Sequence, residues 1–383
     1  MKKIGLLSVY NHNYGSILQA YALQTFIRDA GNDSEIILYK KTNMIKQAKR
    51  LLYFPLLKDT IKMKWKSLYC RLFHPDTYNT ILASREHAFS RFIHNHMLFS
   101  QVYVGRKALI DGTKNYDCFL LGSDQVWNPM NLGGDFYTMT FIPNDKVKIA
   151  YAPSFGITKI PKQQKKKTSE YLKRIDYISV RESDGIRIVE ELTGRRVPQV
   201  VDPTILIERT IWDKKKGERI IKEDYIFCYF ISANAAYRHF AQCLSQKTGL
   251  KLVVLPHVDE FVKADQGFGD IVPEGVGPLQ FVNLVSNASY VCTDSFHGSV
   301  FSTLYERPFF TFSRYARDVA ASTNSRLYSY LKLIGMENRM HNANHVLKDE
   351  DLDKPDFSNA KRILDNMRKK SRNYLLDALK SVG

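Results

Sequence analysis

The stretch from Tyr290 to Phe301 constrains the fold of this chain more than any other part of the sequence. It begins with an apolar run, continues through polar residues that include His297, and enters a second apolar stretch with helical spacing at Gly298. A strand that feeds directly into a helix is typical of a parallel α/β sheet. In open sheets of this kind, ligands bind where strand carboxyl ends meet helix N-termini. Unpaired N–H groups there favour an anion, and a histidine can move protons. We therefore expect a functional site at this stretch.

The same succession of strand, polar loop and helix recurs along the chain. The expected strands are 4–9, 35–39, 117–122, 148–152, 177–180, 225–231, 250–255, 290–293 and 309–312. The expected helices are 16–30, one within 73–99, 160–175, 183–194, 235–248, 278–285 and 359–379. Strands that alternate with helices favour mostly parallel sheets covered by helices on both faces.

Length and a restart of this pattern divide the chain into domains. Its 383 residues exceed what one hydrophobic core usually organises, and the pattern begins again after a charged stretch at 212–223. We expect an N-terminal Rossmann-like domain at 1–210, with a basic helical insertion at 40–100, and a C-terminal Rossmann-like domain at 211–350. A basic amphipathic helix in 351–383 is expected to pack back on the N-terminal domain. The fold class is thus α/β, with two doubly wound domains and a cleft between them.

Composition limits the compartment and the partners. No apolar run reaches the ~18 residues of a transmembrane helix. The five cysteines show neither a C-x-x-C pair nor metal-type spacing, which favours reduced thiols and a cytoplasmic protein. The formal charge of +17 indicates anionic partners, namely nucleic acid, an anionic membrane surface or anionic small substrates. No nucleic-acid-binding motif accompanies the charge, so we expect no nucleic acid partner.

Much of the positive charge lies between Lys40 and Arg71, where ten basic residues face one acidic residue, Asp59. Leucine and aromatic residues are interleaved with the basic ones. Two interpretations stay open. The segment 40–73 is either an interfacial helix that docks the protein on the inner membrane face, or an ordinary helical insertion with a solvated basic face.

Five expected strand ends carry polar or glycine-bearing loops that would converge on the cleft. The candidate residues in these loops are Asn13, Gly15, Ser16, Ser123, Asp124, Ser154, Gly156, Arg181, Asp294, Ser295, His297, Gly298 and Ser299. Taken singly, a glycine can serve a tight turn and a serine can cap a helix. Five such loops at the same edge of the sheets favour a functional site.

His297 is the main candidate for acid–base work, because it stands where a strand meets a helix N-terminus. Asp294 is expected either to orient His297 or to bind a substrate hydroxyl. His12, in the first loop, is a second and weaker candidate.

Arg181 stands at a strand end, where burial without an anionic partner would be costly. It either binds an anionic ligand or forms a buried salt bridge with Glu182 or Asp202. The sequence contains no P-loop, no H-E-x-x-H motif and no Asp-x-Asp arrangement at the strand ends, which favours catalysis without a metal.

Six segments in this order resemble the polysaccharide pyruvyl transferase family. They are Asn13–Ala20, Leu121–Trp127, Ala152–Gly156, Ser179–Glu182, Asp202–Thr204 and Asp294–Gly298. Each segment is short, and the ordered set carries the resemblance. It implies a GT-B-like fold and transfer of a pyruvyl group from phosphoenolpyruvate to sugar hydroxyls, which forms a pyruvate ketal. The acceptor would be a cell-surface glycan, such as an exopolysaccharide or capsule, or its lipid-linked oligosaccharide precursor. No cofactor besides the donor substrate is implied.

Under this resemblance, His297 supplies the proton and Asp294 assists it, while Arg181 and the helix start at Ser295, Gly298 and Ser299 bind the donor. In some members of the family an arginine stands at the position of Ser295. Here it is serine, so another cation, either Arg181 alone or a nearby lysine, must hold the donor. Two alternatives stay open: a GT-B glycosyltransferase that uses a nucleotide-sugar, and a non-catalytic protein that binds glycans or membranes.

Overall fold

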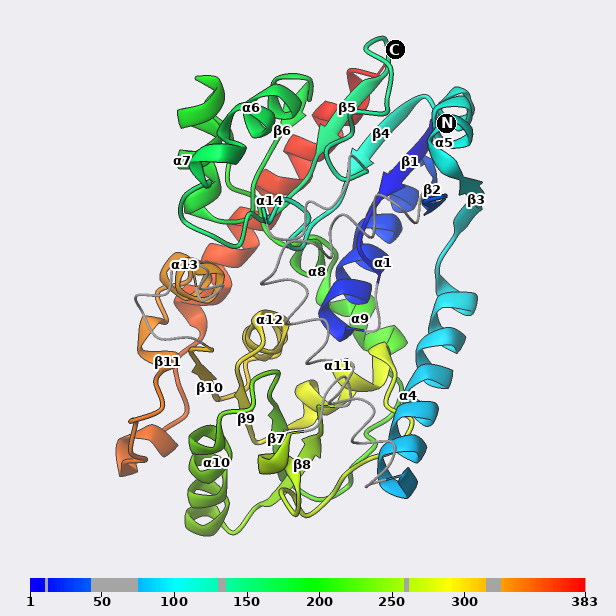
Figure 1. Ribbon diagram of the computed structural model, residues 1–383. Coiled ribbons are helices and arrows are strands. Elements are labelled where there is room, and N and C mark those ends of the chain that lie inside the picture. The colour runs from blue at the N-terminus through cyan, green and yellow to red at the C-terminus, as the bar shows by residue number, and fades with distance from the viewer. Residues whose placement is uncertain (11–12, 43–74, 130–135, 258–261, 315–324, 383) are drawn as a thin grey trace.

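The computed structural model describes residues 1–10, 13–42, 75–129, 136–257, 262–314 and 325–382. In these residues the chain forms two parallel β-sheets with helices packed around them (Figure 1). Most of the basic segment 40–73, with its expected membrane contact, lies outside the described residues, and so does His12. No helix of the described residues has the length and apolar character needed to cross a membrane.

The first sheet has the strand order β3-β2-β1-β4-β5-β6. Its strands are β1 (Lys3–Leu7), β2 (Asp33–Lys40), β3 (Phe99–Val104), β4 (Cys118–Leu121), β5 (Val147–Ala150) and β6 (Tyr177–Ile178). Its helices are α1 (Tyr14–Asp29), α4 (Pro75–His96), α5 (Gly105–Asp111), α6 (Lys165–Lys173), α7 (Ser183–Thr193), α8 (Pro203–Leu206) and α9 (Arg209–Lys215). All strand pairs are parallel, as the alternation of strands and helices predicts.

The second sheet has the strand order β11-β10-β9-β7-β8 and is also fully parallel. Its strands are β7 (Tyr225–Tyr229), β8 (Lys251–Leu255), β9 (Tyr290–Thr293), β10 (Phe309–Phe312) and β11 (Met340–His341). Its helices are α10 (Ala235–Thr248), α11 (Pro278–Asn287), α12 (Phe296–Leu304) and α13 (Ser325–Leu333), and the chain continues into α14 (Ser358–Lys380). The structure thus has the two Rossmann-like units of a GT-B-like α/β fold.

Successive side chains of a strand point to opposite faces of its sheet, and both faces are buried here. In β1, Ile4 and Leu6 join the core shared by the two units, while Leu7 joins a second core beneath α6 and α7. Helices α1, α11 and α12 lie between the two sheets and contact one another (Figure 1). One hydrophobic core therefore runs through the contact between the units.

Helix α14 passes from the second unit back to the first (Figure 1). Its Ser371 hydroxyl accepts a hydrogen bond from the Val201 backbone N–H at 3.0 Å. Near its end, the Leu379 carbonyl accepts a bond from Lys2 Nζ at 2.8 Å. Helix α14 thus packs against the first unit. The expected domain boundary at residue 210 stays a prediction.

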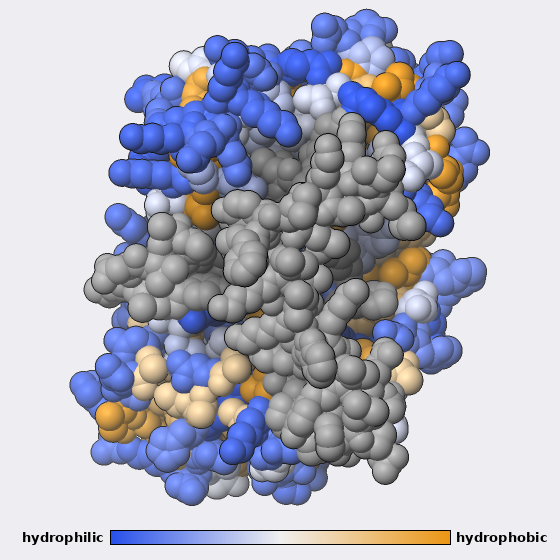
Figure 2. Space-filling model, in the orientation of Figure 1, coloured by the Kyte–Doolittle hydropathy of each residue, from blue (hydrophilic) through white to orange (hydrophobic). Residues whose placement is uncertain are grey.

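The outer surface of the first unit is strongly polar. Figure 2 shows mostly hydrophilic residues over α6 and α7, and the exposed lysines of α6 include Lys166 and Lys167. The buried face of α6 is formed by residues such as Tyr171 and Leu172. This division between faces is what the amphipathic pattern of a surface helix predicts.

Candidate functional site

The two sheets bring their candidate loops to one cavity. Strand order reverses between β1 and β4 in the first sheet and between β7 and β9 in the second. Loops that leave such neighbouring strands diverge and open a crevice for ligands. A cavity of about 430 Å³ lies there, lined by both units. Its polar lining includes Asn13, Ser16, Asp124 and Gln125 from the first unit, and Ser295, His297, Arg314 and Arg326 from the second.

The imidazole of His297 reaches from α12 across to the first unit. The residue is only 5% exposed, and its Nε2 lies 3.6 Å from Asp202 Oδ2. Its Nδ1 lies against α1, because a Cβ placed on Gly15 would be 1.9 Å from that atom. Gly15 is therefore required by the close approach of the histidine ring rather than by a turn.

The buried carboxylate of Asp202 joins several parts of the site. Its Oδ1 accepts hydrogen bonds from the Thr204 backbone N–H and hydroxyl at 3.0 and 2.8 Å. Its Oδ2 accepts from Arg181 Nη1 at 2.7 Å and from the Ser123 hydroxyl at 3.1 Å. Burial raises the pKa of Asp202, but the charges of His297 and Arg181 outweigh burial and hold it well below its usual range. Asp202 is thus an ionised carboxylate beside the imidazole.

Asp294 lies elsewhere than expected. Its two carboxylate oxygens accept hydrogen bonds from the backbone N–H groups of Ile231 and Ser232, at 2.7 and 2.8 Å. The side chain is fully buried, so these bonds fix the loop after β7 to the end of β9. The expectation that Asp294 orients His297 is corrected, because the carboxylate beside the ring is that of Asp202.

Arg181 forms both of the salt bridges that the sequence suggested. Its Nη1 contacts Asp202 at 2.7 Å, and its Nε faces Glu182 at 3.7 Å. Burial lowers the pKa of Arg181, but Asp202, Glu182 and Asp124 outweigh it and raise the pKa above its ordinary value. The guanidinium lies 4.2 Å from the centre of the Phe296 ring and does not line the cavity.

Ser154 and Gly156 both bind Glu182, which forms an ionic network with Arg181 and Asp202. The Ser154 hydroxyl and the Gly156 backbone N–H both donate to Glu182 Oε1, the latter at 3.3 Å. Gly156 has φ of +64°, a conformation that glycine adopts without strain. These two residues therefore hold Glu182 beside Arg181 and lie behind the cavity wall.

Asp124 faces the cavity from a strained backbone position. It has φ of +73°, which is uncommon for a residue other than glycine and is often found at functional sites. Its carboxylate accepts a hydrogen bond from the Ser16 hydroxyl and lies 3.7 Å from Arg326 Nη1. Burial raises the pKa of Asp124, but Arg181, His297 and Arg326 outweigh it and lower the pKa below the usual value. The cavity thus contains an ionised carboxylate.

Two of the lining residues also cap helices. The Asn13 side chain accepts from the backbone N–H groups of Gly15 and Ser16, at 3.0 and 3.3 Å, and so caps α1. The Ser295 hydroxyl accepts from the Gly298 N–H at 3.4 Å and caps α12. Both roles are the usual ones for these residue types at a helix start.

Gly298 and Ser299 face away from the cavity. A Cβ on Gly298 would lie 2.6 Å from Thr293 Oγ1, so this glycine lets α12 pack closely on β9. The Ser299 hydroxyl donates to the Ser295 carbonyl and shares a hydrogen bond with Thr311 Oγ1 at 2.7 Å. The structure therefore gives both residues a role in packing.

Arg314, Arg326 and Gln125 are polar cavity residues that the sequence did not select as candidates. Arg314 follows β10, and its Nε donates to the Asp294 carbonyl at 2.9 Å. Arg326 lies in the first turn of α13, a helix that the sequence did not predict. Arg314 follows a predicted strand end, so the same rule that selected the other loops could have found it. No sequence signal of this kind marks Arg326.

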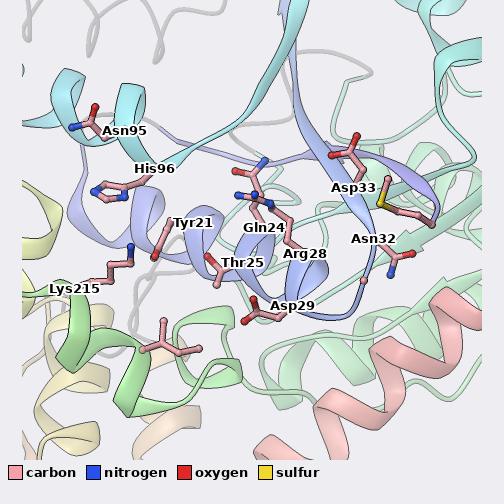
Figure 3. Close-up of a pocket in the computed structure, with 13 residues that line it drawn as sticks. Tyr21, Gln24, Thr25, Arg28, Asp29, Asn32, Asp33, Asn95, His96 and Lys215 are labelled. Carbon is pink, nitrogen blue, oxygen red and sulfur yellow. The ribbon is translucent and has the colours of Figure 1, made fainter.

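A larger cavity of about 710 Å³ lies beside the C-terminal half of α1 (Figure 3). Tyr21, Gln24 and Arg28 of α1, His96 of α4 and Lys215 of α9 border it. It contains none of the candidate strand-end residues. The Gln24 amide is already bonded on both sides, because its nitrogen donates to the Ser34 and Leu98 carbonyls and its oxygen accepts from the Leu98 N–H. We therefore place the candidate site at the cleft between the units.

The sequence profile of the polysaccharide pyruvyl transferase family matches residues 13–315 of the chain. This range contains every candidate residue named from the sequence except His12, and most of the cavity lining. No curated protein matches the chain in sequence.

Several solved structures resemble the chain over most of its length. A UDP-GlcNAc 2-epimerase from Neisseria meningitidis is 11% identical, with 97% of this chain and 100% of that chain covered and a TM-score of 0.48. MurG from Acinetobacter baumannii is 8% identical, with 98% and 99% covered and a TM-score of 0.45. The heptosyltransferase WaaC from E. coli is 11% identical, with 87% and 99% covered and a TM-score of 0.39. Nothing about activity follows from likenesses this distant.

Proposed function

The chain belongs to the polysaccharide pyruvyl transferase family, and from this premise we propose that it transfers a pyruvyl group from phosphoenolpyruvate to two hydroxyls of a sugar. The acceptor is a cell-surface glycan or its lipid-linked oligosaccharide precursor, and the product is a cyclic pyruvate ketal. The enzyme acts in the cytoplasm and needs no cofactor besides its donor substrate.

One observation carries this proposal. The imidazole of His297 lines the cavity between the units, at the positive start of α12, with the buried Asp202 carboxylate 3.6 Å from its Nε2. An imidazole can give and take protons near neutral pH.

The reaction requires a proton donor and an anion-binding cavity. His297 would donate a proton to the methylene carbon of phosphoenolpyruvate, which leaves a cationic centre at the adjacent carbon. The first sugar hydroxyl adds to that carbon and releases its proton to the imidazole. The second hydroxyl displaces the phosphate, which takes up the second proton. The products are the ketal and inorganic phosphate, and His297 returns to its starting state.

The cavity lining suits these steps. Arg314 and Arg326 supply positive charge for the donor, and the ionised Asp124 can accept a hydrogen bond from a sugar hydroxyl. Helix starts at Asn13 and Ser295 flank the cavity, and their partial positive charges also favour an anion.

Thermal unfolding of the pure protein with and without phosphoenolpyruvate tests the donor. A ligand at a hundred times its dissociation constant should stabilise the folded protein by about 2.7 kcal/mol. Release of inorganic phosphate on addition of a candidate acceptor, lost in His297→Ala, tests the transfer. Stabilisation by a nucleotide-sugar but not by phosphoenolpyruvate would refute the proposal in favour of glycosyl transfer. Ligand binding without any turnover would instead indicate a binding protein.

A further inference from the structure

Position 295 contributes no positive charge to the cavity. Ser295 uses its hydroxyl to cap α12 by accepting from the Gly298 N–H, and its own backbone N–H donates to Thr293 Oγ1 at 3.1 Å. The start of α12 still favours an anion through its backbone N–H groups. A donor that carries a phosphate and a carboxylate nevertheless needs a side-chain cation at this place.

Two buried arginines lie close to this position, and only one of them lines the cavity. Arg181 and Arg326 both pack over the ring of Phe296, with their guanidinium carbons 4.2 and 6.0 Å from its centre. Each is 6% exposed. Arg326 borders the cavity together with His297, whereas Arg181 lies behind Phe296. Arg326 is therefore the better placed to contact a ligand.

The two arginines differ in their charge partners among the described residues. Arg181 contacts two carboxylates, Asp202 at 2.7 Å and Glu182 at 3.7 Å. Arg326 has one, Asp124 at 3.7 Å, which also accepts a hydrogen bond from Ser16.

The remaining partner of Arg326 is an uncharged amide. With its amide oxygen turned toward the guanidinium, Gln125 accepts from Arg326 Nη1 at 3.0 Å and from Nε at 3.1 Å. Arg326 is thus well hydrogen-bonded but poorly neutralised.

The pKa values of the two groups follow this difference. The carboxylates around Arg181 outweigh burial and raise its pKa. Burial and the positive charge of Arg181 lower the pKa of Arg326 to about 10, and Asp124 only partly opposes them. A buried cation with too little negative charge around it is stabilised by an incoming anion. Arg326 is such a cation, whereas Asp202 and Glu182 already neutralise Arg181.

On the premise of the function proposed above, we propose that Arg326 is the cation that binds an anionic group of phosphoenolpyruvate, in place of an arginine at position 295. The start of α12 and Arg314 border the same space. Arg181 has a different role, because it holds the Asp202 carboxylate that stands beside His297. The planar fork of an arginine suits both phosphate and carboxylate groups.

Calorimetric titration with phosphoenolpyruvate tests this assignment in the full chain. Arg326→Gln should weaken donor binding on the order of a hundredfold, because it removes a buried charged partner of the ligand. Arg326→Lys keeps the charge but loses the two-pronged geometry, so we expect about tenfold weaker binding.

The matched control is Arg368→Gln on α14. Arg368 is 8% exposed and donates to the Ile205 carbonyl at 2.6 Å, but it does not line the cavity. We expect this variant to melt at a lower temperature and to bind phosphoenolpyruvate as the unchanged protein does.

A second variant keeps Arg326 but adds a negative charge beside its guanidinium. Gln125→Glu would place a carboxylate where the amide oxygen now accepts from the guanidinium. This internal anion should compete with the donor, so phosphoenolpyruvate should bind at least about tenfold more weakly while the melting temperature does not fall. The variant does not depend on the stability of a protein that lacks the arginine.

The outcomes separate this inference from the function on which it rests. If the unchanged protein binds no phosphoenolpyruvate, the proposed function fails. If it binds, and both Arg326→Gln and Gln125→Glu bind equally well, the function stands and the assignment of Arg326 is wrong. Titrations with inorganic phosphate and with pyruvate identify the group that Arg326 binds, since only the affinity for the matching anion should fall in Arg326→Lys.

Discussion

At the scale of single residues, the tightest constraint in the site is the contact between Gly15 and His297. The ring occupies the space that any side chain at position 15 would need, since a Cβ there would be 1.9 Å from Nδ1. The glycine belongs to the first unit and the histidine to the second. The position of the ring therefore depends on how closely α1 and α12 approach.

Gly15→Ala tests this contact. The added methyl group should displace the imidazole, with a loss of about 1–3 kcal/mol of stability from overpacking and a fall in turnover of about a hundredfold or more. Urea unfolding and phosphate release measure the two effects. In a His297→Ala background the methyl group has room, so the same substitution should cost much less stability. Equal costs in both backgrounds would contradict the contact, because only interacting sites are non-additive.

Asp202 makes the ionic network sensitive to acid. Its folded-state pKa lies below the unfolded value of about 3.9, so its contribution to stability is complete above that pH and is lost as the pH falls through the folded-state pKa. Asp202→Asn should lower the free energy of unfolding at pH 7 by about 3–5 kcal/mol, since it leaves Arg181 without its nearest carboxylate.

Urea unfolding between pH 7 and pH 3 checks both expectations for Asp202. The unchanged protein should lose stability below pH 4 more steeply than the variant. Asp377→Asn, at an exposed position of α14, is the control and should change little. Identical pH profiles for Asp202→Asn and the unchanged protein would contradict a lowered pKa of Asp202 in the folded protein.

The sequence predicted part of the site because some residues belong to short motifs at strand ends. Asn13, Ser16, Asp124, Ser295 and His297 were selected in this way, and all line the cavity. Contacts between residues that are distant in the sequence leave no such motif. The pairing of Asp202 with His297 joins positions far apart in the chain. The burial of Asp294 under two backbone N–H groups depends on a loop geometry that its neighbours in sequence do not reveal.

At the scale of elements, α1 is a helix through which the two units contact each other. Thirteen of its residues are buried, on more than one face, because it covers the first sheet and also contacts α11 and α12. A helix that is buried all round lacks the single apolar stripe of a surface helix. Its Tyr14 stacks on Phe281 of α11 at 4.8 Å and donates to the Val276 carbonyl at 2.9 Å.

Phe281→Ala tests the contact between these helices. The ring is fully buried between Tyr14 of the first unit and Tyr229 and Phe301 of the second. Its removal should lower the free energy of unfolding by about 3–5 kcal/mol, from lost burial and the cavity left behind. Val346→Ala, at a side chain that is 75% exposed, is the control and should cost less than about 0.5 kcal/mol. A cost for Phe281→Ala as small as that of the control would contradict the packing described.

The sequence predicted elements best where their own pattern decides their structure. The expected bounds of β9, β10 and α10 agree with the structure, because each is an apolar or amphipathic run between clear stops. It missed β3, α5, α8, α9, α13 and β11. Strand β11 has two residues and exists through its pairing with β10, where Met340 is opposite Thr311. Such an element is determined by its neighbour, and no periodicity in its own residues could predict it.

At the scale of the whole molecule, the two units share one hydrophobic core. The cluster contains Leu6 of the first sheet, Phe227 of the second and Leu375 of α14. Strand and helix alternation predicted two Rossmann-like units, but it contained no information on the surfaces by which they touch. That contact depends on α1, α11 and α12 being apolar on their outer faces as well.

The shared core predicts cooperative unfolding. Scanning calorimetry should show one transition, with a calorimetric enthalpy close to the van't Hoff value, although proteins with two separate domains commonly show more. A bound donor should move the whole transition to higher temperature. Two resolved transitions, of which only one moves with the donor, would show that the units unfold independently.

The position of His297 between the units has one further consequence. The histidine belongs to the second unit, while the carboxylate beside it and the glycine against which it rests belong to the first. The ring therefore keeps both neighbours only while the two units stay in contact. Disrupting the packing between the units would therefore disturb the site even where no residue of the cavity is changed.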